Sequence, residues 1–150
     1  MIPPPTRRAA IALVVAAPLA LRLSPAAATP ETMHAAIDAF TGGTAPTPGR
    51  VTLEVPLLVE NGNAVPLKVS VDSPMTAEDF VEEVAIFNER NPLPDVIRFR
   101  FTPLSGRAAA ETRIRLSGTQ NVHAVARMSD GSFWSATADV IVTAPACAES

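Results

Sequence analysis

Residues 51–71 read VTLEVPLLVENGNAVPLKVSV. Apolar side chains recur at every second position in 51–59 and again in 65–71, and the pair Asn61-Gly62 lies between the two runs. A period of two places one face of a strand in a core and the other face in solvent. An Asn-Gly pair between two such runs is typical of a β-hairpin. This stretch therefore predicts two antiparallel strands, each with one buried face.

Two prolines fall inside these predicted strands. Pro56 and Pro66 have no N–H to donate to a ladder of hydrogen bonds. Each proline is therefore expected at a sheet edge, at a bulge or at the start of a strand.

Strand-like patterns continue along the rest of the chain. About seven short strands at near-regular spacing, separated by turn signals such as Asp130-Gly131, are typical of an immunoglobulin-like sandwich. The predicted fold is all-β: an immunoglobulin-like antiparallel β-sandwich with an N-terminal helix and a C-terminal cysteine arm. Trp134 is expected to pack in its core. The further strand-like runs cover residues 80–87, 97–101, 112–116, 122–128 and 133–143.

A helix is predicted ahead of the strands. Thr29 is a suitable N-cap, Pro30 suits the first helical position, and the pair Gly42-Gly43 ends the pattern. The apolar stripe indicates a helix that covers one end of the domain, with His34 on its solvated side. The stripe consists of Met33, Ala36, Ile37 and Phe40.

The first 28 residues have the three parts of a secretory signal peptide. Arg7-Arg8 closes a basic start, residues 9–21 are almost wholly apolar, and small residues at 26–28 suit cleavage. The arginine pair suggests the twin-arginine route to the periplasm. The expected organisation is a signal peptide (1–28), a helix and linker (29–49), a sandwich (50–143) and a cysteine arm (144–150).

Charge excludes some partners. The chain has 12 basic and 15 acidic residues, and the signal peptide carries three of the arginines and no acid, which leaves a mature net charge of −6. An acidic domain with a single lysine is a poor candidate for binding nucleic acid or an anionic membrane.

Cys147 is the only cysteine, so it has no internal disulfide partner. It follows the last strand-like run on a short tail, and four residues from Thr143 would let its sulfur reach roughly 13 Å from that strand at ~3.3 Å per residue. Two interpretations stay open: a thiol held out on an arm, or an incidental terminal thiol. His34 and His123 have no companion ligands in the sequence, so neither a metal site nor a cofactor is expected.

Four arginines lie on the polar faces of two predicted strands. They are Arg98, Arg100, Arg113 and Arg115. If these strands are neighbours, the guanidinium groups form a basic patch for an anionic partner. The alternative is cross-strand pairing with Glu111 and other acids.

Several motifs together resemble the SoxY family, the sulfur-carrier subunits of the periplasmic thiosulfate-oxidising (Sox) system. They are ENGNAVP (60–66), SPM (73–75), NPLP (91–94), RIRLSGTQNV (113–122) and SDGSFW (129–134). The resemblance covers roughly residues 30–147. It implies an immunoglobulin-like sandwich that forms a heterodimer with a second sandwich, SoxZ, and it implies that Cys147 carries sulfur intermediates covalently. Val96, Val125 and Ile141 fall on nominally outward faces and are candidates for that interface.

The end of the chain departs from the family pattern, which is Gly-Gly-Cys-Gly-Gly. Here Pro145-Ala146 and Ala148-Glu149 flank the cysteine, so the arm is stiffer and bulkier. Glu149 adds a negative charge that disfavours the thiolate. The ending is more similar to a SoxY-related paralogue group with an Ala-Ala-Cys-Ile-Glu type of arm, for which the cargo need not come from thiosulfate.

Two functional hypotheses remain, and an enzyme is not expected because no motif places a base or metal beside Cys147. The first is a covalent carrier that presents sulfur groups on Cys147 to periplasmic enzymes. The second is a non-catalytic interaction module whose cysteine is vestigial or forms an intermolecular disulfide.

Overall fold

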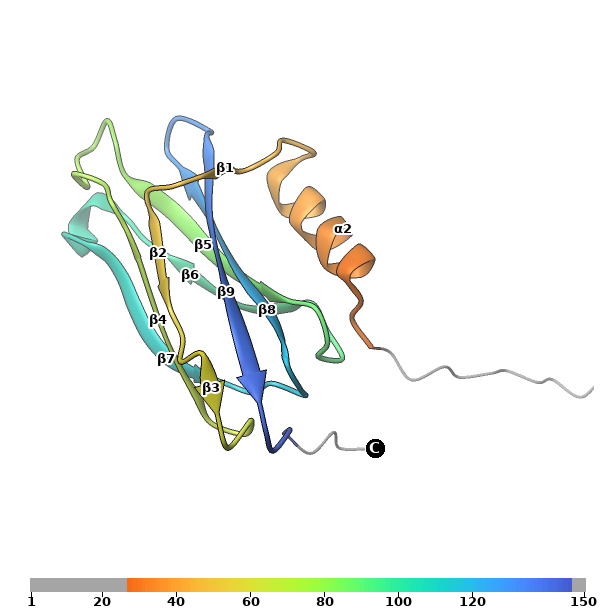
Figure 1. The fold of residues 1–150 in the computed structure, drawn as a ribbon. Helices are drawn as coiled ribbons and strands as arrows, with labels where there is room; N and C mark the ends of the chain where they lie inside the picture. The colour runs from red at the N-terminus through yellow and green to blue at the C-terminus, as the bar shows by residue number, and fades with distance from the viewer. Residues whose placement is uncertain (1–26, 147–150) are drawn as a thin grey trace, which may run out of the picture.

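The computed structural model of the protein describes residues 27–146. In chain order its elements are α2 (Pro30–Thr41), β1 (Thr47–Pro48), β2 (Val51–Glu54), β3 (Leu58–Val59), β4 (Val65–Val71), β5 (Val81–Asn88), β6 (Asp95–Arg100), the 3₁₀ helix η1 (Pro103–Ser105), β7 (Ala108–Ile114), β8 (Gln120–Met128) and β9 (Phe133–Val142). Two sheets pack face to face, and α2 lies outside the larger one (Figure 1). The larger sheet has the order β1-β9-β8-β5-β6, with β3 also on β9, and the smaller sheet has the order β2-β4-β7.

The predicted all-β sandwich is confirmed. Long antiparallel pairings join β5, β6, β8 and β9 in one sheet and β2, β4 and β7 in the other. The two short strands β1 and β3 depart from the antiparallel prediction, because both run parallel to β9. They lie at opposite ends of its free edge and shorten the stretch of edge that is left open.

The predicted hairpin over residues 51–71 forms only in part. β2 pairs antiparallel with β4, with Val51 opposite Val71 and Glu54 opposite Lys68. The pairing stops before Pro56, which has no N–H for the ladder, and the chain then crosses to the other sheet as β3. The predicted turn is present at Gly62-Asn63, but it connects the two sheets, so the predicted hairpin between paired strands on either side of it is wrong.

The core lies between the inner faces of the sheets. Burial in β4 alternates as predicted, with the odd-numbered residues 65–71 buried and Pro66 and Lys68 exposed. Burying a side chain of this size contributes roughly 1.5–3 kcal/mol. Trp134 is half-buried and packs against the same cluster, which confirms its predicted place. The fully buried members include Val65, Leu67, Val69, Val84, Ile86, Leu116 and Val122.

The predicted helix is present, with Thr29 as N-cap and Gly42 as C-cap. It lies along the outer face of the larger sheet, a wider contact than the predicted cover over one end of the domain (Figure 1). Phe40 stacks edge-to-face on Phe87 at 6.0 Å between ring centroids and on Phe133 at 5.9 Å. Ala85, Phe87 and Val125 are buried on this face because the helix covers them.

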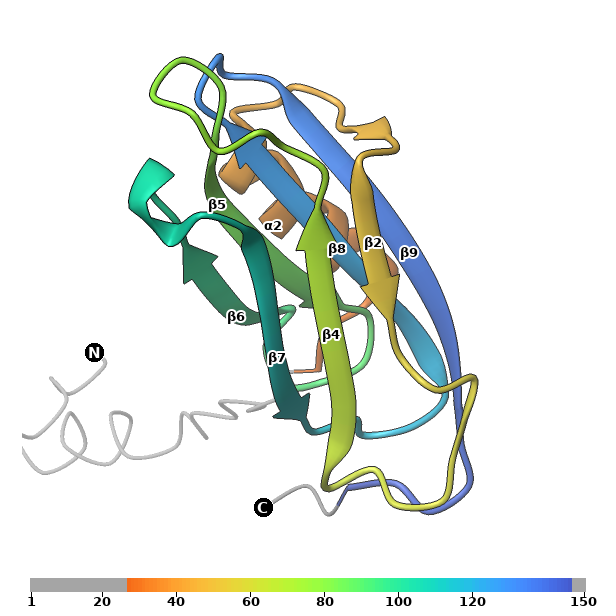
Figure 2. The ribbon, with the colours of Figure 1, turned by 90° about the vertical axis from the view of Figure 1, so that its left-hand side faces the viewer.

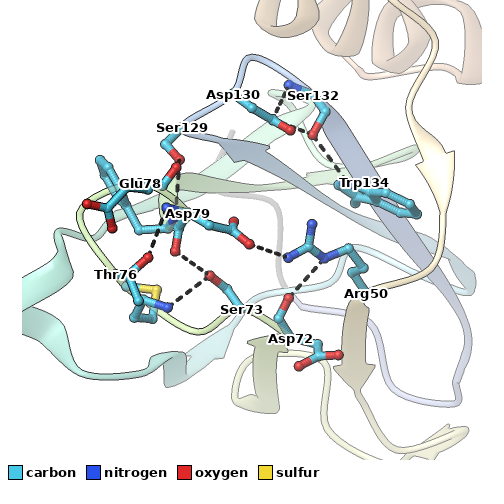
Figure 3. Close-up of polar contacts among 12 residues, drawn as sticks. Arg50, Asp72, Ser73, Thr76, Glu78, Asp79, Ser129, Asp130, Ser132 and Trp134 are labelled. Carbon is cyan, nitrogen blue, oxygen red and sulfur yellow. Dashed lines mark hydrogen bonds and ion pairs between the residues drawn. The ribbon is translucent and has the colours of Figure 1, made fainter.

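The end of the sandwich away from the chain's C-terminus is held by polar side chains (Figure 3). We call residues 72–80 and 129–132, together with Arg50, the far end. Arg50 Nε donates to the Asp72 carbonyl at 3.0 Å, and Arg50 Nη2 pairs with Asp79 Oδ2 at 3.7 Å. Ser129 Oγ accepts from the Phe80 N–H at 3.1 Å and so joins the two loops.

Two further observations concern the described part of the chain. The helices of residues 27–146 are all too short or too polar to cross a membrane. Residues 27–146 also lack any cluster of three or more His, Cys, Asp and Glu side chains arranged as metal ligands.

Candidate functional site: the root of the cysteine arm

Cys147 itself lies outside the described residues, so the site is built from the segment that leads to it. β9 ends at Val142, and the chain continues in a described stretch as far as Ala146. We call residues 144–146 the arm root. It lies at the end of the sandwich opposite the far end, beside the connection from β3 to β4 (Figure 2).

The approach to the arm root runs along a parallel track. The Ile141 N–H donates to the Leu57 carbonyl at 2.8 Å, and the Thr143 N–H donates to the Val59 carbonyl at 3.0 Å. Because β3 crosses from the smaller sheet, these bonds tie the last strand to the connection between the sheets. This parallel pairing brings the residues after β9 next to Gly62.

Four residues then form a main-chain junction, which we define as Gly62, Leu116, Ala144 and Ala146. The Gly62 N–H donates to the Ala144 carbonyl at 2.8 Å, and the Gly62 carbonyl accepts from the Leu116 N–H at 2.8 Å. The Ala146 N–H donates to the Leu116 carbonyl at 3.0 Å. Pro145, which has no N–H, takes the exposed position between the two bonded alanines.

Gly62 is buried at the centre of this junction, and space explains its lack of a side chain. A Cβ at this position would collide with the Leu116 carbonyl, lie 2.6 Å from the Ala146 nitrogen and lie 3.1 Å from the Ala144 carbonyl oxygen. Its φ angle is outside the left-handed region, so backbone conformation does not require glycine. Glycine is required because the arm root approaches this position too closely for a side chain.

Leu116 is fixed from two directions. Its side chain is fully buried in the core. The Asn91 side chain holds the residues on either side of it, because Nδ2 donates to the Arg115 carbonyl at 2.7 Å and Oδ1 accepts from the Ser117 N–H at 3.1 Å. Gln120 Nε2 donates to the same oxygen at 3.3 Å. The core therefore sets the position of the groups that the arm root binds.

The arm root corrects the predicted reach of the thiol. The sequence placed the free span of the arm after Thr143, but Ala144 and Ala146 are both hydrogen-bonded to the body of the domain. The described hydrogen bonds therefore hold the chain to the domain as far as Ala146. Leu57, Leu58 and Ile141 lie beside the track and leave 64%, 59% and 46% of their surfaces exposed.

The structure does not bring the four predicted arginines together. β6, which carries Arg98 and Arg100, belongs to the larger sheet, whereas β7, which carries Arg113, belongs to the smaller one. Arg98 lies over the Phe40 ring at 5.2 Å and pairs with Asp95, and Arg100 lies 3.6 Å from Glu83. The shared basic patch is therefore wrong. The alternative of cross-strand pairing with acids holds for Arg100 and Glu83, whereas Arg98 pairs within its own strand and Glu111 lies 3.4 Å from Lys68.

One of the candidate interface residues is also misplaced. Val125 is buried to 1% exposure because α2 packs on the outer face of β8. Val96 is half-buried against the core, and Ile141 is exposed. The outward direction of Val125 was right, but the helix covers the face, so Val125 is wrong as a partner contact.

The two histidines are closer in space than their separation in sequence suggests. His123 is half-buried, its Nδ1 lies 3.1 Å from Thr137 Oγ1, and its buried Nε2 has no hydrogen-bond partner within the described residues. Burial lowers the pKa of His123, and the nearby His34 lowers it further, while Glu89 and Asp139 act in the opposite direction. His34 is exposed, as predicted.

Sequence reasoning missed the junction because its contacts are made by main-chain atoms. A usable signal did exist: three segments that carry the resemblance to SoxY meet there. These are ENGNAVP at 60–66, which supplies Gly62, NPLP at 91–94, which supplies Asn91, and RIRLSGTQNV at 113–122, which supplies Leu116. The structure thus brings these three motifs together beside the arm root.

Comparison with solved structures supports the fold and the relationship. The sulfur carrier protein SoxY from Chlorobium limicola f thiosulfatophilum is 26% identical, with a TM-score of 0.62 over 75% of this chain and 97% of that chain. A superoxide reductase (neelaredoxin) from Ignicoccus hospitalis is 16% identical, with a TM-score of 0.56 over 63% and 80% of the two chains. At that identity the second likeness concerns the fold alone. No curated protein sequence matches the chain.

A family comparison addresses the sequence directly. The family described as "Sulfur oxidation protein SoxY" matches residues 37–147, a range that runs from the middle of α2 to the cysteine. This match spans strands β1 to β9 of the described residues, the junction and Cys147. The chain therefore belongs to the SoxY family of sulfur oxidation proteins.

Proposed function

We propose that the protein is a covalent carrier of sulfur groups, with Cys147 as the attachment point and the sandwich as its handle. The observation that carries the proposal is the family match, which extends to residue 147 and so includes the sole cysteine. The similar protein from Chlorobium limicola is itself a sulfur carrier. The arm root supports the role, because it lies at one end of the sandwich and precedes Cys147 directly in the sequence.

The chemistry of loading is thiol–disulfide exchange. The Cys147 thiol loses its proton to solvent, and the thiolate attacks a sulfur of a donor of the type R–S–S–R′. A bond forms between the Cys147 sulfur and the R–S sulfur as the donor's S–S bond breaks, and R′–S⁻ leaves with the electron pair. One S–S bond replaces another, so the step needs no oxidant. Unloading repeats the step with the enzyme's thiolate as the attacking group.

The test is Cys147→Ser, which keeps the size of the side chain and removes the nucleophile. We expect this variant to fold and to bind partners as the wild type does, and to abolish pathway activity in a strain that lacks the native gene. Full complementation by the serine variant would rule out the carrier role.

The second candidate is the interaction module, in which Cys147 is vestigial or forms an intermolecular disulfide. The altered arm, with Pro145 and Glu149 in place of glycines, favours it over a standard Sox carrier. Intact mass of protein isolated from its source separates the two candidates. Sulfur adducts on Cys147 indicate a carrier, whereas a clean thiol or a disulfide-linked dimer indicates the module.

The same proposal extends to location and partner. We propose export to the periplasm with cleavage of residues 1–28, and a heterodimer with a SoxZ-like sandwich that buries roughly 1,600 Å². N-terminal sequencing of periplasmic material tests the cleavage. Light scattering of the co-expressed chains tests the heterodimer, and a chain that stays monomeric at micromolar concentration would contradict it.

A further inference from the structure

We propose that the junction is a positioning device: bare Gly62 lets the arm root bind Leu116, and this fixes the point and direction from which Cys147 leaves the domain. Gly62 and Leu116 are then positioning residues for sulfur transfer. The inference rests on the proposed function for its purpose, whereas the geometry of the junction stands independently of it.

The arm root is bound to the body of the domain through both of its alanines. Ala144 accepts a hydrogen bond from Gly62, and Ala146 donates one to Leu116. Pro145, between them, is exposed and has no N–H, so it adds no donor that needs a partner. A tail that served only to be long and loose would have no use for this alternation.

The second step is that the receiving group cannot shift easily. Leu116 uses both of its main-chain polar groups in the junction, its N–H for Gly62 and its carbonyl for Ala146. Its buried side chain and the Asn91 bridge across its neighbours hold it in place. The rigidity of the core therefore extends to within one residue of Cys147.

The third step concerns the benefit for transfer. Attack on a sulfur requires alignment of the incoming thiolate with the S–S bond that breaks, and small displacements reduce the rate strongly. A thiol that leaves the domain from a fixed residue meets a docked enzyme with less conformational entropy to lose. The held arm root takes the place of the glycines that precede the cysteine in the family pattern.

The test is Gly62→Ala. Since the φ angle of Gly62 is not in the left-handed region, the added methyl acts through its contacts with Leu116, Ala144 and Ala146 rather than through backbone strain. We expect the Ala146 amide to exchange with solvent roughly tenfold faster, as for the loss of one hydrogen bond. A nitroxide label on Cys147, the sole cysteine, should move faster in electron paramagnetic resonance spectra.

Gly106→Ala is the matched control. Gly106 has φ +69° and no atom within 4 Å of its absent Cβ, so alanine there strains the backbone without contact with the junction. It should reduce stability and leave the label motion and the Ala146 exchange unchanged. If Gly62→Ala fails to fold, Ala146→Pro removes the bond to Leu116 from the other side and keeps Gly62 intact.

Function is read as the fraction of Cys147 that carries a sulfur adduct in protein recovered from the source organism, measured by intact mass. Gly62→Ala should lower this fraction at least about tenfold at equal amounts of folded protein. Alkylation of Cys147 by iodoacetamide, a small reagent that needs no docking, should stay unchanged.

Two outcomes overturn the inference. One is unchanged label motion and Ala146 exchange in Gly62→Ala, which would mean that the junction does not hold the arm root. The other is a freed arm root with wild-type adduct levels, which would mean that transfer does not depend on positioning. The carrier role fails separately, on full complementation by Cys147→Ser.

Discussion

At the far end of the sandwich, side chains reinforce the main-chain hydrogen bonds between the loops, whereas the junction at the arm end is made by main-chain atoms alone. Arg50, Asp79 and Ser129 link the far-end loops with a guanidinium, a carboxylate and a hydroxyl (Figure 3). At the arm end, Gly62, Leu116 and Ala146 meet through amides and carbonyls. A substitution can remove the side-chain bonds of one residue directly. The main-chain bonds of the junction are weakened only by a substitution that adds bulk beside them or disturbs the core packing beneath them.

This difference has a functional meaning for the arm end. A main-chain junction keeps side chains out of the way, because Gly62 has none and Ala144 and Ala146 have methyl groups. The surface at the arm root therefore includes the exposed Ala144 and the exposed side chains of Leu57 and Leu58. At the far end the polar side chains bond one another and the loop backbone, so their contribution is to hold the loops in place.

The largest effect is expected for Leu116→Ala. The side chain is fully buried, so its truncation should reduce the free energy of unfolding by roughly 2–5 kcal/mol in urea denaturation. It should also loosen the Leu116 carbonyl and raise the exchange rate of the Ala146 amide under native conditions. Leu67→Ala is the control, since Leu67 is equally buried in β4 and makes no junction contact. Equal Ala146 exchange in the two variants would break the proposed link between core and arm.

A smaller effect is expected at the far end for Arg50→Ala. The change removes the bond to Asp72, the pair with Asp79 and the contact with the Trp134 ring at 5.5 Å, and should cost about 1–2 kcal/mol. The motion of a nitroxide on Cys147 should not change, because the contacts that Arg50 makes with Asp72, Asp79 and Trp134 do not involve the junction.

Arg50→Gly separates side chain from backbone at the same position. Arg50 has φ +55°, a left-handed conformation that costs an alanine about 1 kcal/mol and costs glycine almost nothing. The glycine variant should therefore be the more stable of the two in the same urea titration. A less stable glycine variant would mean that the loop, rather than the side-chain network, dominates at this end.

The alternation of residues made the sandwich predictable, and the capping residues made the helix predictable. Val65 to Val71 alternate in burial as their sequence does, and Thr29 and Gly42 mark the helix ends as expected. The partial failure at residues 51–71 has a local cause, because Pro56 interrupts the ladder and the choice of a new partner strand depends on distant β9. The burial of Val125 required pairing the helix stripe with the outer face of β8, which are about 90 residues apart in sequence.

The part of the site that residue type marks could be predicted from the sequence. The part that depends on contacts between distant segments could not. Cys147 stands out as the only cysteine, but nothing in residue type distinguishes Leu116 from any other buried leucine. Gly62 lies in a turn as predicted, but its room for the arm root could not be predicted from residue type. The arginine prediction failed because the chain changes sheets between Arg100 and Arg113, and periodicity does not indicate such a crossing.

The smallest effect concerns His123, which lies under the helix layer between the two ends. Because burial lowers its pKa in the folded protein, the unfolded chain binds more protons below about pH 6.5. The histidine's contribution to stability is therefore complete above that pH and is lost as the pH falls through the lower, folded-state pKa. Between about pH 7.5 and about pH 5.5, wild type should lose more stability than His123→Gln in matched urea titrations. An identical loss of stability in wild type and His123→Gln would show that other groups set the acid sensitivity. A change in the motion of a label on Cys147 over the same pH range would show that the arm end is not independent of the helix layer.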